Sequence, residues 1–176
     1  MTATQALQWL GVTLHVLGAA GYIGGSIAME FVLSPAQKAI PPAQAMVVGE
    51  KTADRFIWIA WGSLLLLLLG ALIRLQWGGA GLTMVYGFGT DYGRTVFVKA
   101  ILWIVLVVNG AIITFVLRPK LKGKMSGGAT AAQAQQSQQM KARAARQITV
   151  LTRVDLGIMI VVLILGTSLR SMQGIL

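Results

Sequence analysis

The sequence predicts an all-α fold, an integral membrane four-helix bundle that forms a single transmembrane domain over residues 1–176. Hydrophobic residues make up 56% of the chain, charged residues only 11%, and the mean hydropathy is +0.73. A typical soluble domain has about 25% charged residues, so this composition predicts a chain that lies in a bilayer. Four continuous apolar runs each reach the roughly 20 helical residues that cross about 30 Å of hydrocarbon.

The four predicted helices follow these apolar runs in order. Because the runs are continuous rather than alternating, and because an open sheet edge cannot be satisfied in lipid, strands are excluded. The first run has no basic leader and is longer than the apolar stretch of a signal peptide, so we expect a retained helix. The expected helices cover about 7–33, 56–75, 95–117 and 148–169.

The connections between the predicted helices differ in composition. Residues 43–54 predict a short helix that runs into the second transmembrane helix, and residues 76–93 form a glycine-rich connection whose aromatic residues suit the headgroup region. Within the long connection 118–147, residues 119–130 are rich in Lys, Gly and Ser and predict a mobile linker. Residues 131–147 contain helix formers and no Gly or Pro, so they predict a basic helical extension before helix 4.

The basic residues predict how the bundle is oriented. Ten of the fifteen lysines and arginines fall in the connections after helices 1 and 3. The positive-inside rule makes these connections cytoplasmic, with both termini outside and the protein in the inner (cytoplasmic) membrane. The net charge of +10 then reflects topology and attraction to anionic lipid headgroups, not nucleic-acid binding, since no aromatic-and-basic motif accompanies it. The ten residues are Lys38, Lys51, Arg55, Arg118, Lys120, Lys122, Lys124, Lys141, Arg143 and Arg146.

His15, the single histidine, is a candidate ligand in the first helix. At 100° per residue it shares a stripe with small residues, which mark close helix contacts, so it is expected to face protein rather than lipid. Three roles remain open: a hydrogen bond to a neighbouring helix, a ligand of a metal or haem, or a proton-handling group. The glycines of this region are also a candidate contact with other membrane subunits. They are Gly11, Gly18, Gly21 and Gly25.

Lys99 is the expected companion of His15. Lys99 lies about 8 Å below the outer end of the third helix and His15 about 12 Å below the outer start of the first. We expect the two to form a cofactor-binding site in the outer half, with His15 as its metal-binding residue and copper and haem both open. Two confined cations repel strongly, so such a site needs a neutral Lys99 or an anionic ligand, such as a lipid phosphate or a porphyrin propionate. The alternative is that Lys99 extends to the outer surface.

Four further charged residues lie in the predicted helices toward the cytoplasmic side. An unpaired charge at this depth would cost several kcal/mol, so carboxylate–arginine pairs between helices are the expected arrangement. Arg153 and Asp155 are 200° apart around their helix and must therefore find partners on other helices. A proton or ion path is the alternative. The residues of these expected ion pairs are Glu30, Arg55, Arg153 and Asp155.

Motifs of known catalytic sites are missing from the sequence. There are no cysteines, which excludes disulfides and thiolate metal sites, and the eight methionines are scattered without an MxM or MxxM cluster. The chain contains no HExxH, no P-loop and no GxSxG. We therefore assign no catalytic residue, and the sequence favours a role other than that of an enzyme.

Two segments resemble the copper-resistance protein D (CopD) family. In residues 14–35 (LHVLGAAGYIGGSIAMEFVLSP) a histidine precedes small residues and a Gly-Gly, and the helix is expected to stop at proline. Residues 93–111 (GRTVFVKAILWIVLVVNGA) resemble the family's helix with Gly-Arg followed by lysine. The pattern of helix 2, in which Arg55 and Trp61 precede a leucine run and Arg74, also fits that family, as does the end of helix 4 at Arg170. The resemblance implies a membrane protein of copper uptake or copper handling.

The pairing of a histidine in helix 1 with a lysine in helix 3 is also similar, more weakly, to HemJ-type protoporphyrinogen oxidases. That resemblance implies that His15 and Lys99 are the functional pair of a protein of haem synthesis. Three functions are therefore open: copper handling or transport, a non-catalytic accessory or scaffold subunit of a larger membrane complex, and a haem- or tetrapyrrole-linked membrane oxidoreductase.

Overall fold

The computed structural model describes residues 2–77, 90–122 and 131–172, and no strand occurs in these ranges. Four helical segments are long and apolar enough to cross a membrane, which confirms the predicted four-helix membrane fold. The orientation of the bundle stays a prediction. The four segments are Ala3–Lys38, Pro42–Trp77, Asp91–Leu121 and Gln135–Ser168.

Two of the four segments are composite helices. The first consists of α1 (Ala3–Ile27), the π-helical segment η1 (Ala28–Leu33) and α2 (Ser34–Lys38). The third repeats this plan with α5 (Asp91–Ala111), the π-helical segment η2 (Ile112–Leu117) and α6 (Arg118–Lys122). The other two segments lie in single helices, α3 (Pro42–Trp77) and α7 (Ala131–Met172).

Each π-helical segment precedes a proline by the same offset. η1 ends two residues before Pro35, and η2 ends two residues before Pro119. A proline inside a helix lacks its N–H group, and its ring clashes with the carbonyl four residues earlier. A π turn relieves this by letting that part of the helix widen. The expectation that the first helix stops at Pro35 is therefore wrong, because the helix continues past the proline to Lys38.

Side-chain caps set where α1 and α5 begin. Thr2 accepts a hydrogen bond from the backbone of Gln5, and the Gln5 side chain accepts one from the backbone of Thr2, which together form a capping box. Thr90 accepts from the backbone N–H of Gly93 and is followed by Asp91, whose charge favours a helix N-terminus. The third membrane helix therefore begins at Asp91, four residues before the predicted start at 95.

The connections agree with the prediction only in part. Residues 119–122, expected in a mobile linker, instead form most of α6 (Arg118–Lys122), because the third membrane helix continues past Pro119. Residues 43–54 belong to α3, and α7 begins at Ala131, which confirms the helical extension before the fourth membrane segment. Residues 78–89 of the glycine-rich connection and residues 123–130 of the predicted linker lie outside the described residues.

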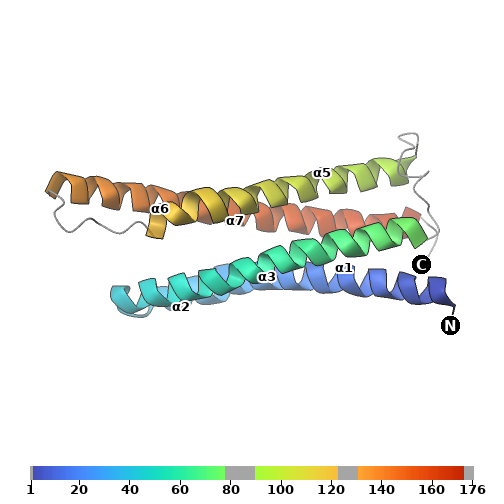
Figure 1. Ribbon diagram of the computed structural model, residues 1–176, viewed down its shortest axis with the longest axis horizontal. Helices are drawn as coiled ribbons and strands as arrows, with labels where there is room; N and C mark the ends of the chain where they lie inside the picture. The colour runs from blue at the N-terminus through green and yellow to red at the C-terminus, as the bar shows by residue number, and fades with distance from the viewer. Residues whose placement is uncertain (1, 78–89, 123–130, 173–176) are drawn as a thin grey trace.

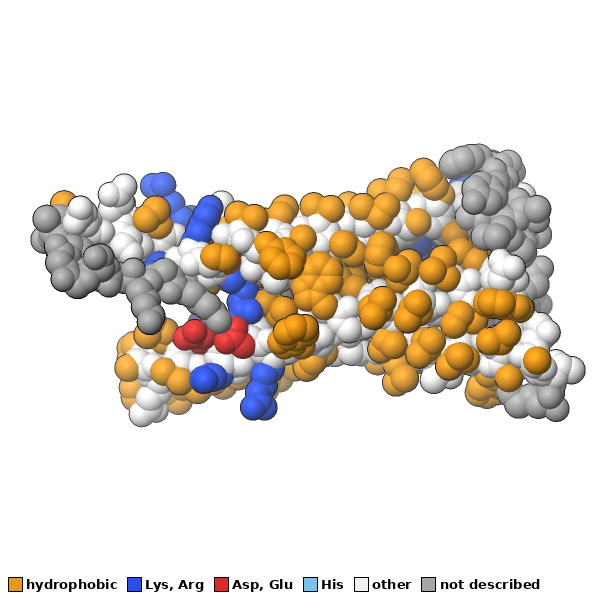
Figure 2. Space-filling model, in the orientation of Figure 1, with side chains coloured by type: hydrophobic (Ala, Val, Ile, Leu, Met, Phe, Trp, Pro, Cys, Tyr) orange, Lys and Arg blue, Asp and Glu red, His pale blue; other side chains and the backbone are white. Residues whose placement is uncertain are grey.

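The helices form two antiparallel pairs along the chain, α1 with α3 and α5 with α7 (Figure 1). α1 begins and α7 ends at one end of the bundle, while α2, α6 and the start of α7 lie at the other. We refer to the end that carries α2 and α6 as the basic end. Figure 2 shows hydrophobic side chains over the middle of the visible face, with charged side chains gathered toward the basic end.

A narrow core lies between the helices. Leu106 is fully buried and packs with residues of three other helices: Tyr22, Leu64, Leu67 and Met159. Outside this core, large apolar side chains such as Trp9, Trp58 and Phe115 are exposed. A soluble protein rarely exposes so much apolar surface, so this surface fits contact with lipid.

Candidate functional site

His15 lies where α1 and α3 approach each other most closely. A Cβ atom added at Gly70 would be 2.6 Å from the backbone nitrogen of His15, and one added at Gly18 would be 2.7 Å from the carbonyl oxygen of Ser63. Gly11 and Gly25 are equally tight against side chains of α3. Only glycine allows such contact, because any larger residue would separate the backbones.

The glycine face of α1 is therefore occupied within the chain. At the four positions proposed for contact with other subunits, the neighbouring atoms among the described residues belong to α3: Ile73 and Arg74 at Gly11, Ser63 and Leu67 at Gly18, Ser63 at Gly21 and Phe56 at Gly25. Association with other subunits stays a prediction, and these glycines already serve the α1–α3 contact.

The imidazole of His15 is held by α3. Its Nδ1 lies 3.1 Å from the carbonyl oxygen of Leu67. A carbonyl oxygen can only accept a hydrogen bond, so Nδ1 is the donor and carries a proton. In the neutral ring this leaves a lone pair on Nε2, which can accept a proton or bind a metal ion.

Lys99 and Arg74 bring positive charge to the same region. Both act electrostatically on His15, and Arg74 acts on Lys99. The Lys99 Nζ lies 3.2 Å from where a Cβ atom on Gly166 would be, which places this ammonium group against α7. Lys99 and Arg74 are therefore two cationic neighbours in the region of His15, whereas a binding site shared by His15 and Lys99 stays a prediction.

Asp155 has partners other than the expected arginines. Its side chain is only 3% exposed. Asn109 donates a hydrogen bond to Oδ1 at 2.8 Å, and the Tyr22 hydroxyl donates one to Oδ2 at 3.3 Å. The ion pair expected for Asp155 is wrong for the described residues, because its face of α7 turns inward toward α1 and α5 while Arg153 points outward.

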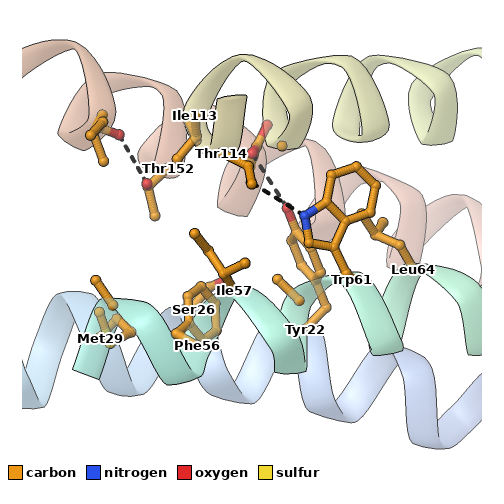
Figure 3. Close-up of a pocket in the computed structure, with 15 residues that line it drawn as sticks. Tyr22, Ser26, Met29, Phe56, Ile57, Trp61, Leu64, Ile113, Thr114 and Thr152 are labelled. Atoms are coloured by element: carbon orange, nitrogen blue, oxygen red, sulfur yellow. Dashed lines mark hydrogen bonds between the residues drawn. The ribbon is translucent and has the colours of Figure 1, made fainter. Parts of the chain in front are cut away.

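A cavity of about 110 Å³ adjoins Asp155 (Figure 3). All four membrane segments contribute to its wall, and the polar side chains beside Asp155 and Trp61 are Tyr22, Ser26, Thr114 and Thr152. Trp61 donates an indole hydrogen bond to the hydroxyl of Thr114 at 3.2 Å. The cavity extends from Leu64 to Ala53 along α3, which is about 16 Å of helix in the direction of the basic end.

Ion pairs connect the helices near the basic end. Glu30 Oε1 in η1 lies 2.7 Å from Arg153 Nη2 in α7. Asp54 in α3 pairs with Arg118 at the start of α6. Two of the four expected residues therefore pair with each other, whereas Arg55 forms no ion pair with Glu30 or Asp155 in the described part of the chain.

Sequence reasoning gave no role to Tyr22, Asn109 or Thr114. A signal was present for the first two, since Tyr22 is on the inward stripe of His15 and Asn109 is a lone amide in an apolar run. Their contacts with Asp155 depend on how the four helices pack against one another. The periodicity of a single helix does not predict such packing.

The described residues contain no group of three or more His, Cys, Asp or Glu side chains that could hold a metal ion. His15 is therefore a single candidate ligand with two cationic neighbours. This donor set does not fit a closed, permanently occupied metal site, which needs three or four ligands. One imidazole nitrogen does fit a weak and reversible contact with copper.

Comparison with known proteins identifies one family. The family model described as Copper resistance protein D matches residues 50–169, or 120 of the 176 residues. The match begins inside α3 and ends inside α7, so it includes Lys99 and Asp155 and leaves out His15. No curated protein and no solved structure matches the chain.

Proposed function

Because the chain belongs to the copper resistance protein D family, we propose that it handles copper in the membrane, with the metal as cargo and His15 as its ligand. The protein is a multi-pass membrane protein related to copper resistance.

One observation carries this proposal: the hydrogen bond from His15 Nδ1 to the carbonyl oxygen of Leu67. Histidines that bind metals commonly donate their other ring N–H to a carbonyl, which fixes the tautomer and aims the free nitrogen. Imidazole nitrogen suits copper, and the chain has no cysteine or second histidine to compete with it.

The neighbours of His15 favour release over storage. Lys99 and Arg74 place positive charge near any cation bound at Nε2, and like charges repel strongly where water is scarce. A single imidazole with two cationic neighbours binds copper weakly. Weak binding suits a protein that passes copper on.

We further propose the orientation given by the positive-inside rule, with the basic end in the cytoplasm and the protein in the inner membrane. In support, a pocket of about 510 Å³ between α6 and α7 at that end is lined by Lys120, Lys141 and Arg143. Basic pockets at the cytoplasmic surface bind anionic lipid headgroups, which fits the expected contact with such lipids.

The test is copper binding by the purified protein under reducing conditions, with metal analysis and an absorption spectrum. We expect bound Cu(I) in the wild-type protein and none above background in His15→Ala. A Soret band would instead support the tetrapyrrole-linked function. If the protein binds neither copper nor a chromophore, the result favours the function as an accessory subunit.

Lys99→Met separates a cationic cargo from an anionic ligand. If copper binds at His15, removal of the neighbouring positive charge should tighten Cu(I) binding several-fold. If the site holds an anion such as a porphyrin propionate, the same substitution should weaken binding. Arg94→Met is the matched control, since Arg94 lies on the same helix beside Asp91 at the end of the bundle.

A further inference from the structure

Asp155 is a carboxyl group inside the bundle, and its hydrogen-bond partners among the described residues are uncharged side chains. Its side chain is 3% exposed, and no lysine or arginine in the described part of the chain is within ion-pair distance. The nearest arginine in sequence, Arg153, binds Glu30 on the outside of α7. An ionised carboxylate in such surroundings is destabilised unless it is fully hydrogen-bonded, so the neutral acid is an accessible state.

The two hydrogen-bond partners differ in what they can do. The Asn109 amide donates to Oδ1, and this bond is compatible with an ionised or a protonated carboxyl group. The Tyr22 hydroxyl can both donate and accept. It donates to Oδ2 when Asp155 is ionised and accepts from Oδ2–H when Asp155 is protonated, with no movement of heavy atoms. The distance of 3.3 Å is long for an O–H···O bond, so Tyr22 compensates the charge only weakly.

The cavity supplies space for water beside this carboxyl group. Tyr22, the hydrogen-bond partner of Asp155, lies toward the inner part of the cavity, and Met29 lies at the end nearer the basic surface. About 110 Å³ is several times the roughly 10–15 Å³ that one water molecule needs. When Tyr22 accepts a hydrogen bond from protonated Asp155, its own hydrogen can turn toward water in this cavity.

We propose that Asp155 is a proton-binding site that exchanges its proton with water through the cavity, from the basic end of the bundle. The proton binds at Oδ2, and Tyr22 reverses its hydrogen bond. A metal cation fits less well, because the carboxylate oxygens already face the donor groups of Tyr22 and Asn109 and most of the cavity wall is apolar. This inference does not rest on the proposed copper function, since His15 and Asp155 are separate sites.

The charged groups around Asp155 are few. Tyr22 on α1 is the titratable side chain in contact with it, α5 contributes the uncharged Asn109, and α3 contributes no charged residue to the cavity wall. Glu30 of η1 and Arg153 of α7 neutralise each other nearby. A change in the protonation of Asp155 is therefore measurable as a single event.

The test is infrared difference spectroscopy of the full-length protein in lipid, between alkaline and acidic buffer in H2O and in D2O. The chain has only five carboxylic side chains, so the carbonyl band of a protonated acid can be assigned by substitution. We expect one such band to appear on acidification, to shift in D2O and to vanish in Asp155→Asn. The amide of that variant can keep both hydrogen bonds, and circular dichroism should show that it folds.

Two further variants make the assignment specific. Glu30→Gln is the matched control and should leave the band in place. Tyr22→Phe should keep the band and move its frequency, because the protonated carboxyl group loses its hydrogen-bond acceptor. The proposal is overturned if no acid band appears while the helical signal persists, if the band survives in Asp155→Asn, or if it neither responds to pH nor exchanges with D2O.

Discussion

Two ion pairs near the basic end differ in how well water reaches them. In the pair between Glu30 and Arg153 the side chains are 21% and 62% exposed, whereas in the pair between Asp54 and Arg118 the exposures are 39% for Asp54 and 15% for Arg118. Water screens the first pair at its arginine, and exposed pairs contribute only about 0.2–1 kcal/mol. The second arginine is mostly enclosed, and hydrogen bonds to such charged groups contribute about 1.5–3 kcal/mol.

We therefore predict unequal coupling energies from two double-mutant cycles. Glu30→Gln with Arg153→Gln should give the smaller coupling and Asp54→Asn with Arg118→Gln the larger, as measured from the free energy of unfolding in detergent. Equal coupling energies, or a larger one for the pair of Glu30 and Arg153, would contradict the expectation that the more enclosed pair stabilises the protein more.

For single residues, the sequence predicts the depth along a helix better than it predicts the hydrogen-bond and ion-pair partners. Depth along a helix follows from residue number, so His15 and Lys99 could be expected at one level. The partners of Asp155 could not be expected, because the choice between an arginine and the pair Tyr22 and Asn109 depends on the rotation of three helices about their axes. That rotation is set by the whole packed interface.

Among the helices, the α1–α3 contact is sensitive to single methyl groups. A Cβ atom at Gly18 would meet the backbone of Ser63 at 2.7 Å, whereas one at Gly24 would have nothing within 4 Å. Gly18→Ala should therefore destabilise the protein by about 1–3 kcal/mol through overpacking. Gly24→Ala, on the same helix, should be neutral or stabilising by up to about 1 kcal/mol, since alanine is the better helix former.

Thermal unfolding of the two glycine variants checks this prediction. A lower midpoint for Gly18→Ala with an unchanged or higher one for Gly24→Ala is the expected pattern. If both variants unfold together with the wild-type protein, the close approach of α1 to α3 does not exist in the membrane.

The helix ends show where sequence patterns were sufficient and where they were not. The hydrophobic runs predict the membrane segments, and the absence of Gly and Pro from residues 131–147 predicts the helical extension at the start of α7. The sequence predicts that the first helix stops at Pro35, yet this helix and the one that contains Pro119 both continue, each through a π-helical segment. A proline removes one backbone hydrogen bond of the helix, and contacts with neighbouring helices and a local π turn can compensate for this loss.

For the whole molecule, the arrangement of charge predicts one orientation. Because the chain has no cysteine, single cysteines report topology on a clean background. In intact cells, a membrane-impermeant thiol reagent should label Thr2→Cys, and it should label Gln138→Cys only after the membrane is opened. Both positions are exposed. The reverse pattern would overturn the orientation and move the basic end outside.

The four-helix bundle is predictable from the sequence because few backbone structures can cross a lipid bilayer. Backbone groups in hydrocarbon must bond within the helix, so length and hydropathy are enough to define four spans. Function was less predictable, since the only histidine and a buried carboxyl group lie on different helices and at different depths. The roles of these two side chains depend on the neighbours Leu67 and Tyr22, which no sequence motif predicts.

Copper handling by this protein depends on copper binding at the imidazole of His15. X-ray absorption spectroscopy at the copper edge of the Cu(I)-loaded protein measures this directly. Scattering from one imidazole ring is expected in the wild-type protein and in Gly24→Ala, and it should be lost in His15→Ala. Copper bound without imidazole scattering, or the same spectrum in His15→Ala, would contradict the claim.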